Sequence, residues 1–132
     1  MPLDVTDQQW LTDQGFEFEV VDEAGWTNLI FKDYVLPPGF DRERTDLLVR
    51  LPPGFPDAPP DMFWVDPPIR LSRNQAFAQA SEAVESHVGR SWQRFSRHLQ
   101  AGAWRPGIDS LESWIMKRPR FGAAPMRVAA LG

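Results

Sequence analysis

The chain has 132 residues, of which 42% are hydrophobic and 24% charged, and it contains no cysteine. This length fits one globular domain with a buried core. The lack of cysteine excludes disulfides, thiolate metal ligands and every reaction that needs a thiolate. No window approaches the roughly 18 consecutive apolar residues of a membrane span, and the N-terminus lacks the pattern of a secretory signal. We therefore expect a cytoplasmic protein that does not act at a membrane.

The net charge is −4, and it is unevenly distributed. Residues 1–66 carry 14 acidic and four basic side chains, whereas residues 67–132 carry four acidic and ten basic ones. An acidic total does not favour general nucleic-acid binding. The two histidines, His87 and His98, are too few for a histidine-rich metal site, so we expect neither a metal nor a cofactor.

The N-terminal half predicts one helix and then a sheet. Thr6 and Gln9 have the spacing of a helix-capping box, and Gly15 is placed to end the helix that they begin. Strand-like runs follow, and nine of the 13 prolines lie between positions 37 and 68. Because proline donates no backbone hydrogen bond, these prolines mark connectors between strands. We predict an antiparallel meander of four strands over residues 16–20, 26–35, 45–51 and 62–65.

The C-terminal half predicts helices, because its apolar residues recur at helical spacing, as in Trp92, Phe95 and Leu99. The expected helices cover residues 74–88, 92–99 and 109–118 and are bounded by Asn74, Gly89, Asp109 and Pro119. Strands followed by helices indicate an α+β fold. We expect one domain over residues 1–117 and a tail over residues 118–132 that is either mobile or held by a partner.

A proline-rich connector and the order of the predicted elements together resemble a known superfamily. Residues 51–60 read Leu-Pro-Pro-Gly-Phe-Pro-Asp-Ala-Pro-Pro, and residues 104–106 read Trp-Arg-Pro. The first run is similar to the connector between the third and fourth strands of ubiquitin-conjugating (UBC) domains. The second stands where UBC domains usually carry Trp-Ser-Pro before a crossing helix. The resemblance spans approximately residues 14–117 and implies a UBC-like fold with Phe55 and Trp104 in its core.

Four shorter segments look like one bacterial branch of this superfamily, the prokaryotic family E. They are residues 36–40, 46–48, 59–63 and 92–98. The genes of that branch are similar in setting to systems with a ubiquitin-like protein, an activating enzyme and a JAB-type peptidase. The resemblance therefore implies a ubiquitin-like protein, an activating enzyme, or both, as partners. The sequence Leu-Pro-Pro-Gly-Phe occurs at residues 36–40 and again at 51–55, which we interpret as two similar turns.

The sequence departs from the superfamily at the residues that carry its chemistry. UBC enzymes hold the ubiquitin-like tail as a thioester on a cysteine, because a thiolate is both a good nucleophile and a good leaving group. This chain has no cysteine, and Asp66-Pro67-Pro68 stands in place of the His-Pro-Asn motif. Pro68 offers no side-chain amide to steady an oxyanion. The resemblance thus implies a scaffold, similar to UBC variants that bind ubiquitin without conjugating it.

Ser96 is the candidate for a replacement nucleophile, with His98 as its base. On a helix these two residues would point in different directions, whereas on a strand they would share a face. A serine also needs an oxyanion hole, and no Gly-x-Ser-x-Gly elbow is present. The alternative for His98 is a structural side chain that bonds to the backbone or to a carboxylate such as Asp109.

An aromatic and basic stretch supplies the candidate binding residues, which are Trp92, Arg94, Arg97 and Arg105. Such residues are common anchors of protein interfaces, and they also stack on single-stranded nucleic acid. In the alternative interpretation Trp92, Phe95 and Trp104 belong to the core, and only the arginines reach a partner. Asp41, Glu43 and Asp46 suggest a metal site, but the arginines among them favour a solvated loop.

The function best supported by the sequence is a non-catalytic UBC-like binding module in a bacterial ubiquitin-like conjugation pathway. One alternative is an active conjugating enzyme that uses Ser96 or acts on a partner-held thioester. Another is a peptide-binding adaptor unrelated to conjugation, whose proline-rich connectors recognise peptides. An engineered replacement of a cysteine would give the same sequence pattern.

Overall fold

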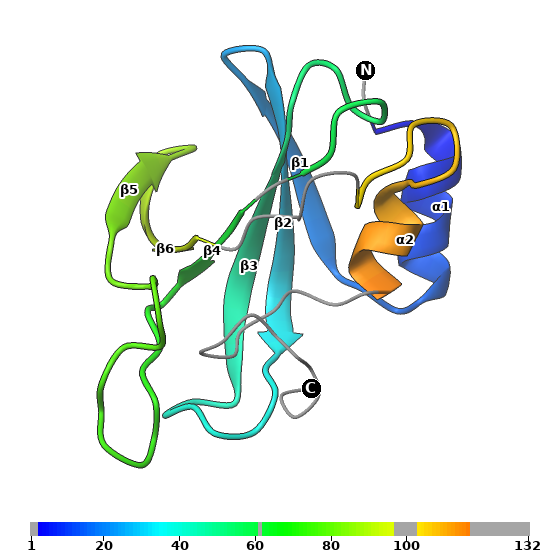
Figure 1. The fold of residues 1–132 in the computed structure, drawn as a ribbon. Coiled ribbons are helices and arrows are strands. Elements are labelled where there is room, and N and C mark those ends of the chain that lie inside the picture. Colours follow the sequence, from blue (N-terminus) through cyan, green and yellow to red (C-terminus); the bar gives the residue numbers. More distant parts are fainter. Residues whose placement is uncertain (1–2, 61, 97–102, 117–132) are drawn as a thin grey trace.

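The computed structural model describes residues 3–60, 62–96 and 103–116, which form two helices and one six-stranded antiparallel sheet (Figure 1). The strand order in the sheet is β1-β2-β3-β4-β6-β5. The elements are α1 (Val5–Asp13), β1 (Phe18–Glu23), β2 (Trp26–Val35), β3 (Arg44–Leu51), β4 (Phe63–Asp66), β5 (Val84–His87), β6 (Arg90–Phe95) and α2 (Leu111–Met116). The α+β class predicted from the sequence is confirmed, but the sheet has six strands instead of four.

The first four strands form an antiparallel meander, with β2, β3 and β4 within one residue of their predicted ranges and β1 displaced from the predicted range of 16–20. β1 pairs with β2, β2 with β3, and β3 with β4, each antiparallel to its neighbour. In the middle of β2 every residue from Thr27 to Phe31 is buried. Successive residues of a strand point to opposite faces, so this continuous burial means that both faces of the sheet are covered there.

The first helix begins two residues before the position that the capping box implied. The side chain of Asp4 accepts a hydrogen bond from the backbone N–H of Asp7 at 2.8 Å, so Asp4 is the N-cap and Thr6 lies inside the helix. An aspartate satisfies a free N–H of the first turn as well as a threonine does. Gly15 follows the helix with a φ of +86°, in agreement with the predicted stop.

The helices predicted over residues 74–88 and 92–99 are wrong for the described residues. Residues 74–83 form turns and irregular backbone, and β5 and β6 form a hairpin. Gln75, Ala80 and Val88 have positive φ values of 60°, 55° and 47°, which a right-handed helix does not allow. The helix predicted over residues 109–118 corresponds to α2, which covers Leu111–Met116.

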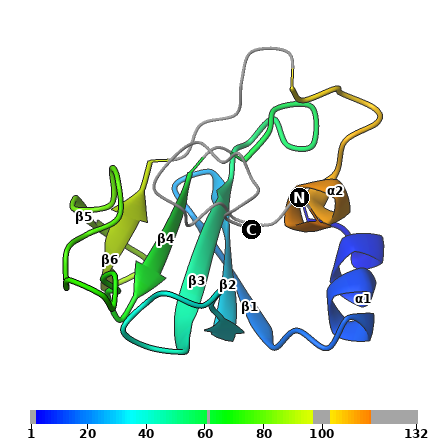
Figure 2. The ribbon, with the colours of Figure 1, turned by 60° about the horizontal axis from the view of Figure 1, so that its bottom comes forward.

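The structure contains two separate hydrophobic cores, one on each face of the sheet. Figure 2 shows α1 and α2 on one side of the sheet, and the larger core, which includes Leu11 of α1 and Leu111 of α2, lies on that side. The second core, on the opposite face, consists of Ile30, Leu48, Trp64 and Trp92. The β5–β6 turn reaches over this face, because the backbone N–H of Val88 donates to a Glu23 side-chain oxygen at 3.2 Å. The β5–β6 turn is thereby tied to the end of β1 by one hydrogen bond across this face.

The proline-rich connector of residues 51–60 is anchored in the core through Phe55, as the resemblance implied, whereas Trp104 is only half-buried against that core. Phe55 is 5% exposed, and its ring centroid lies 6.2 Å from that of Trp104. The indole N–H of Trp104 also donates to the carbonyl of Pro56 at 2.9 Å. The connector and the segment before α2, 48 residues apart, thus hold each other in place.

Residues 97–102 and 117–132 lie outside the described residues, and so do the predictions that concern Arg97, His98 and the C-terminal tail. In the part of the chain that the structure describes, no helix has the length and apolar character needed to cross a membrane.

Candidate functional site

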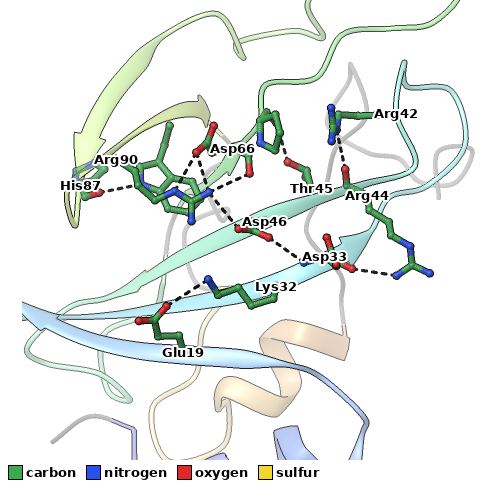
Figure 3. Close-up of polar contacts among 12 residues, drawn as sticks. Glu19, Lys32, Asp33, Arg42, Arg44, Thr45, Asp46, Asp66, His87 and Arg90 are labelled. Carbon is green, nitrogen blue, oxygen red and sulfur yellow. Dashed lines mark hydrogen bonds and ion pairs between the residues drawn. The ribbon is translucent and has the colours of Figure 1, made fainter.

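The Asp66-Pro67-Pro68 segment, which replaces the His-Pro-Asn motif, begins at the last residue of β4. The guanidinium of Arg90 donates to one Asp66 side-chain oxygen through Nε at 3.0 Å and through Nη2 at 2.8 Å. The same Nη2 donates to Asp46 at 3.2 Å, and the other oxygen of Asp46 accepts from the backbone N–H of Asp33 (Figure 3). Asp66 is therefore held by a positive charge from the neighbouring hairpin.

The electrostatics of this group favour a charged, fixed arginine. Partial burial acts to lower the pKa of Arg90, but its hydrogen bonds to Asp66 and Asp46 outweigh burial and raise the pKa above the usual value. The guanidinium also lies over the Trp92 ring, 4.3 Å from its centroid. With its donors directed at two carboxylates, Arg90 is held as a structural clamp on the end of β4.

The backbone that follows Asp66-Pro67-Pro68 is fixed by a single buried amide. Gln93 is 3% exposed, and its side-chain oxygen accepts from the backbone N–H of Ile69 at 2.7 Å. Its amide nitrogen donates to the carbonyl oxygens of Ile69 at 3.0 Å and Ser81 at 2.8 Å. Sequence reasoning missed Gln93, because a lone glutamine in a strand carries no motif. Both ends of the 69–81 segment are thereby bonded to β6.

A second polar cluster lies on β5 and β6, around the carboxylate of Glu85. One Glu85 oxygen accepts from the Trp64 indole N–H at 3.0 Å and lies 3.0 Å from His87 Nε2, and the other accepts from Arg94 Nη1 at 2.6 Å. Burial acts to raise the pKa of Glu85, but the hydrogen bonds with His87, Trp64 and Arg94 lower it overall. Glu85 is thus a stable carboxylate and a poor proton acceptor near neutral pH.

Ser96 lies directly after β6 and lines a surface hollow with Arg94, Ala80, Glu82 and Ala83. Its hydroxyl oxygen accepts a hydrogen bond from Arg94 Nε at 3.0 Å. A guanidinium keeps its proton at all ordinary pH values, so Arg94 cannot take the proton of the hydroxyl. By donating to the oxygen it also makes the oxygen a weaker nucleophile. His98, the predicted base, lies outside the described residues.

The candidate binding residues do not lie on one continuous strip. Trp92 is 0% exposed and donates its indole N–H to the carbonyl of His87, so it belongs to the second core and its predicted contact with a partner is wrong. Arg94 is half-buried and paired with Glu85. Arg105 is exposed in the loop before α2. The core interpretation of the aromatic residues is therefore confirmed for Trp92 and Phe95.

Asp41 and Asp46 do not converge on one point. Asp41 accepts from the backbone N–H of Arg70 at 3.0 Å, whereas Asp46 bonds to Arg90 and to the Asp33 backbone. Within residues 3–60, 62–96 and 103–116, no group of three or more potential ligands is placed to hold a metal ion. Arg42 and Arg44 donate to the backbone carbonyls of Arg44 and Asp33, so the described contacts do not show the expected pairing of these arginines with the neighbouring carboxylates.

Another polar group that sequence reasoning missed is Arg50, which lies on the face of the second core. Arg50 Nε donates to the side-chain oxygen of Asn28 at 2.9 Å. Its guanidinium carbon lies 4.8 Å from the centroid of the Trp26 ring and 5.9 Å from that of Trp64. The four side chains come from the three strands β2, β3 and β4, so only the paired sheet brings them together.

Comparison with protein families identifies the chain. A family model described as prokaryotic E2 family E matches residues 3–119, where E2 is the general term for ubiquitin-conjugating enzymes. The chain belongs to this family. No curated protein and no solved structure matches it.

Proposed function

We propose that this chain is a non-catalytic E2-like binding module of a bacterial ubiquitin-like conjugation pathway in the cytoplasm. Its partners in this proposal are a ubiquitin-like protein, an activating enzyme, or both. The observation that carries the proposal is the lack of any cysteine among 132 residues in a member of an E2 family. A thioester cannot form without a thiol, so the transfer chemistry of the superfamily has no acceptor on this chain.

The surroundings of the Asp66-Pro67-Pro68 segment and of Ser96 support the same proposal. At the Asp66-Pro67-Pro68 segment the side chain of Arg90 is directed at Asp66 and Asp46, and Pro68 supplies no donor for an oxyanion. At Ser96 the nearest described cation is the guanidinium of Arg94, which donates to the hydroxyl oxygen and cannot act as a base. Neither place offers an activated nucleophile among the described residues.

The proposed binding role uses arginines of the C-terminal half of the chain. Arg105 is exposed beside the Phe55–Trp104 contact, and Arg94 is half-buried at the edge of the Ser96 hollow. Arginine is enriched among residues that contribute strongly to protein interfaces. We include Arg94, Arg97 and Arg105 as candidate contacts with an acidic partner surface.

The test is reconstitution with the cognate activating enzyme, the ubiquitin-like protein and nucleotide, followed by intact-mass spectrometry. We expect no covalent adduct on this chain and a stoichiometric, non-covalent complex in a binding assay. The thioester on the activating enzyme itself is the positive control for activation. A hydroxylamine-sensitive adduct that disappears in Ser96→Ala would refute the proposal and establish a serine-based conjugating enzyme instead. A chain that binds neither protein would also refute it.

A further inference from the structure

Arg50 is held in one orientation by a buried asparagine. Asn28 is 0% exposed, and its amide nitrogen donates to the backbone carbonyl of Val21 at 3.1 Å. Because this bond fixes the amide, the Asn28 oxygen is directed at Arg50 Nε and accepts a hydrogen bond from it at 2.9 Å. The side chain of Arg50 thus has little freedom left, and ordering it on binding costs little entropy.

Aromatic rings flank the same guanidinium. Its carbon lies 4.8 Å from the ring centroid of Trp26, within the range of a cation–π contact, and 5.9 Å from that of Trp64. The ring of Trp26 is half-buried, whereas Trp64 is 5% exposed and forms the floor. The planar guanidinium of Arg50 therefore lies between the half-buried ring of Trp26 and the buried ring of Trp64, on the face of the sheet opposite to the helices.

The other two arginines of this face are paired with carboxylates, but Arg50 is not. Arg90 pairs with Asp46 and Asp66, and Arg94 pairs with Glu85. No carboxylate of the described residues lies within ion-pair distance of Arg50, and its two terminal nitrogens have no hydrogen-bond partner there.

The nearby carboxylates are committed to other groups. Burial lowers the pKa of Arg50, while the more distant charges of Glu23 and Glu85 act in the opposite direction. Glu23 accepts from the backbone N–H of Val88, and Glu85 accepts from Trp64 and Arg94. The terminal N–H groups of the half-buried Arg50 guanidinium are fixed in position and have no acceptor among the described residues. A carboxylate matches such a pair of donors in both shape and charge.

From these contacts we propose that Arg50 is the anchor of a docking surface for a protein partner that presents an aspartate or glutamate side chain to it. The terminal nitrogens of Arg50 bind the carboxylate end-on, and Trp26 packs beside it as the apolar rim. The combination of a central arginine and a tryptophan is typical of residues that dominate interface energies. This surface deepens the proposed function, since it describes how the module holds a partner without a covalent bond.

The first experiment measures binding of the purified ubiquitin-like protein and of the activating enzyme to the full chain by calorimetry. We expect Arg50→Ala to weaken the complex at least tenfold and Arg50→Lys, which keeps the charge but loses the fork, to weaken it several-fold. Arg70→Ala is the matched control, because Arg70 is an exposed arginine over the Phe77 ring at 4.0 Å in a different loop. Equal affinities of Arg50→Ala and Arg70→Ala would overturn the inference and leave the proposed function intact.

A second experiment decides the inference even if neither protein binds, which would refute only the proposed function. The Nε–Hε NMR signals of the arginines in the wild-type chain are followed during titration with a blocked tetraglutamate peptide. We expect a saturable shift of the Arg50 signal and none of the Arg70 signal. An Arg50 signal that moves no more than that of Arg70 would overturn the inference, and this readout does not depend on how well the variants fold.

Discussion

The sequence Leu-Pro-Pro-Gly-Phe occurs at residues 36–40 and at residues 51–55, and the two copies differ in conformation and contacts. In the first copy Gly39 has a φ of +108°, and Phe40 forms a β-bridge with Leu71. In the second copy Phe55 turns back on Pro52, to whose carbonyl its N–H donates at 2.9 Å, and its ring is buried. The expectation of two similar turns was therefore wrong.

The residue after each phenylalanine explains the difference. Asp41 follows Phe40, and its backbone N–H donates to the carbonyl of Arg70 at 2.9 Å, which continues the bridge. Pro56 follows Phe55 and has no N–H, so the second copy cannot make the same pairing. Five identical residues thus take the conformation that their next neighbour and their tertiary partner allow.

The largest expected difference between the copies is in the phenylalanine rings. Phe55→Ala removes a ring that is 5% exposed, so we expect a loss of about 3–5 kcal/mol in the free energy of unfolding. Phe40→Ala removes a half-buried ring, and we expect a loss of about 1–2 kcal/mol. Urea denaturation of the two variants measures both values. Equal losses would mean that the two copies contribute equally to the core.

The partner of the second copy gives the next effect. Trp104→Ala removes a half-buried ring beside Phe55 and the hydrogen bond to Pro56, and should lower the unfolding free energy by about 2–3 kcal/mol. Trp104→Phe keeps an aromatic ring and loses the hydrogen bond, so it should lose about 1 kcal/mol. Thermal and urea unfolding distinguish the two variants. A melting temperature unchanged in Trp104→Ala would show that the ring is only a surface feature.

The glycines of the two copies provide a smaller and cleaner contrast. Gly39 has a positive φ that alanine rarely adopts, so Gly39→Ala should cost about 1–2 kcal/mol although its Cβ meets nothing within 4 Å. Gly54 has no such φ, and its added Cβ would lie 3.4 Å from that of Ala58. We therefore expect a change within about 0.5 kcal/mol for Gly54→Ala. The opposite order in urea midpoints would contradict the backbone argument.

The smallest expected effect concerns the acidic residues that follow each copy. Asp41→Ala removes the side-chain acceptor of the Arg70 N–H and should cost about 1 kcal/mol. Asp57→Ala, in the exposed turn of the second copy, should change the unfolding free energy by less than about 0.5 kcal/mol. Faster amide exchange of Arg70 in Asp41→Ala, but not in Asp57→Ala, would locate the effect. Similar exchange in both variants would show that this side chain does not hold the loop.

The same dependence on tertiary partners explains which elements the sequence predicted. β2 and β3 have long strand-like runs, so their positions follow from local residues alone. Trp92 and Phe95 were interpreted as one face of a helix because they are three residues apart. In β6 they point to opposite faces and are each completely buried, one in each core. A strand with a core on both sides can thus imitate helical spacing.

The candidate site was predictable only where it carries a motif. The Asp66-Pro67-Pro68 segment and the Phe55–Trp104 contact were found from the resemblance to a family. Gln93 and Arg50 are single polar residues in strands, and their partners Ile69 and Asn28 lie 24 and 22 residues away. No local pattern encodes such a pairing, because it exists only once the strands are in register.

The buried side chain of Gln93 has a consequence for the exchange of backbone amide hydrogens with solvent. With one acceptor and one donor directed at Ile69, this amide group bonds to the chain as the peptide group of a neighbouring strand would. Ile69 belongs to no strand, and its backbone N–H donates its hydrogen bond to a side chain. The residue is nevertheless 0% exposed. Its amide hydrogen should therefore exchange as slowly as those of β6, and only as fast as the sheet itself opens.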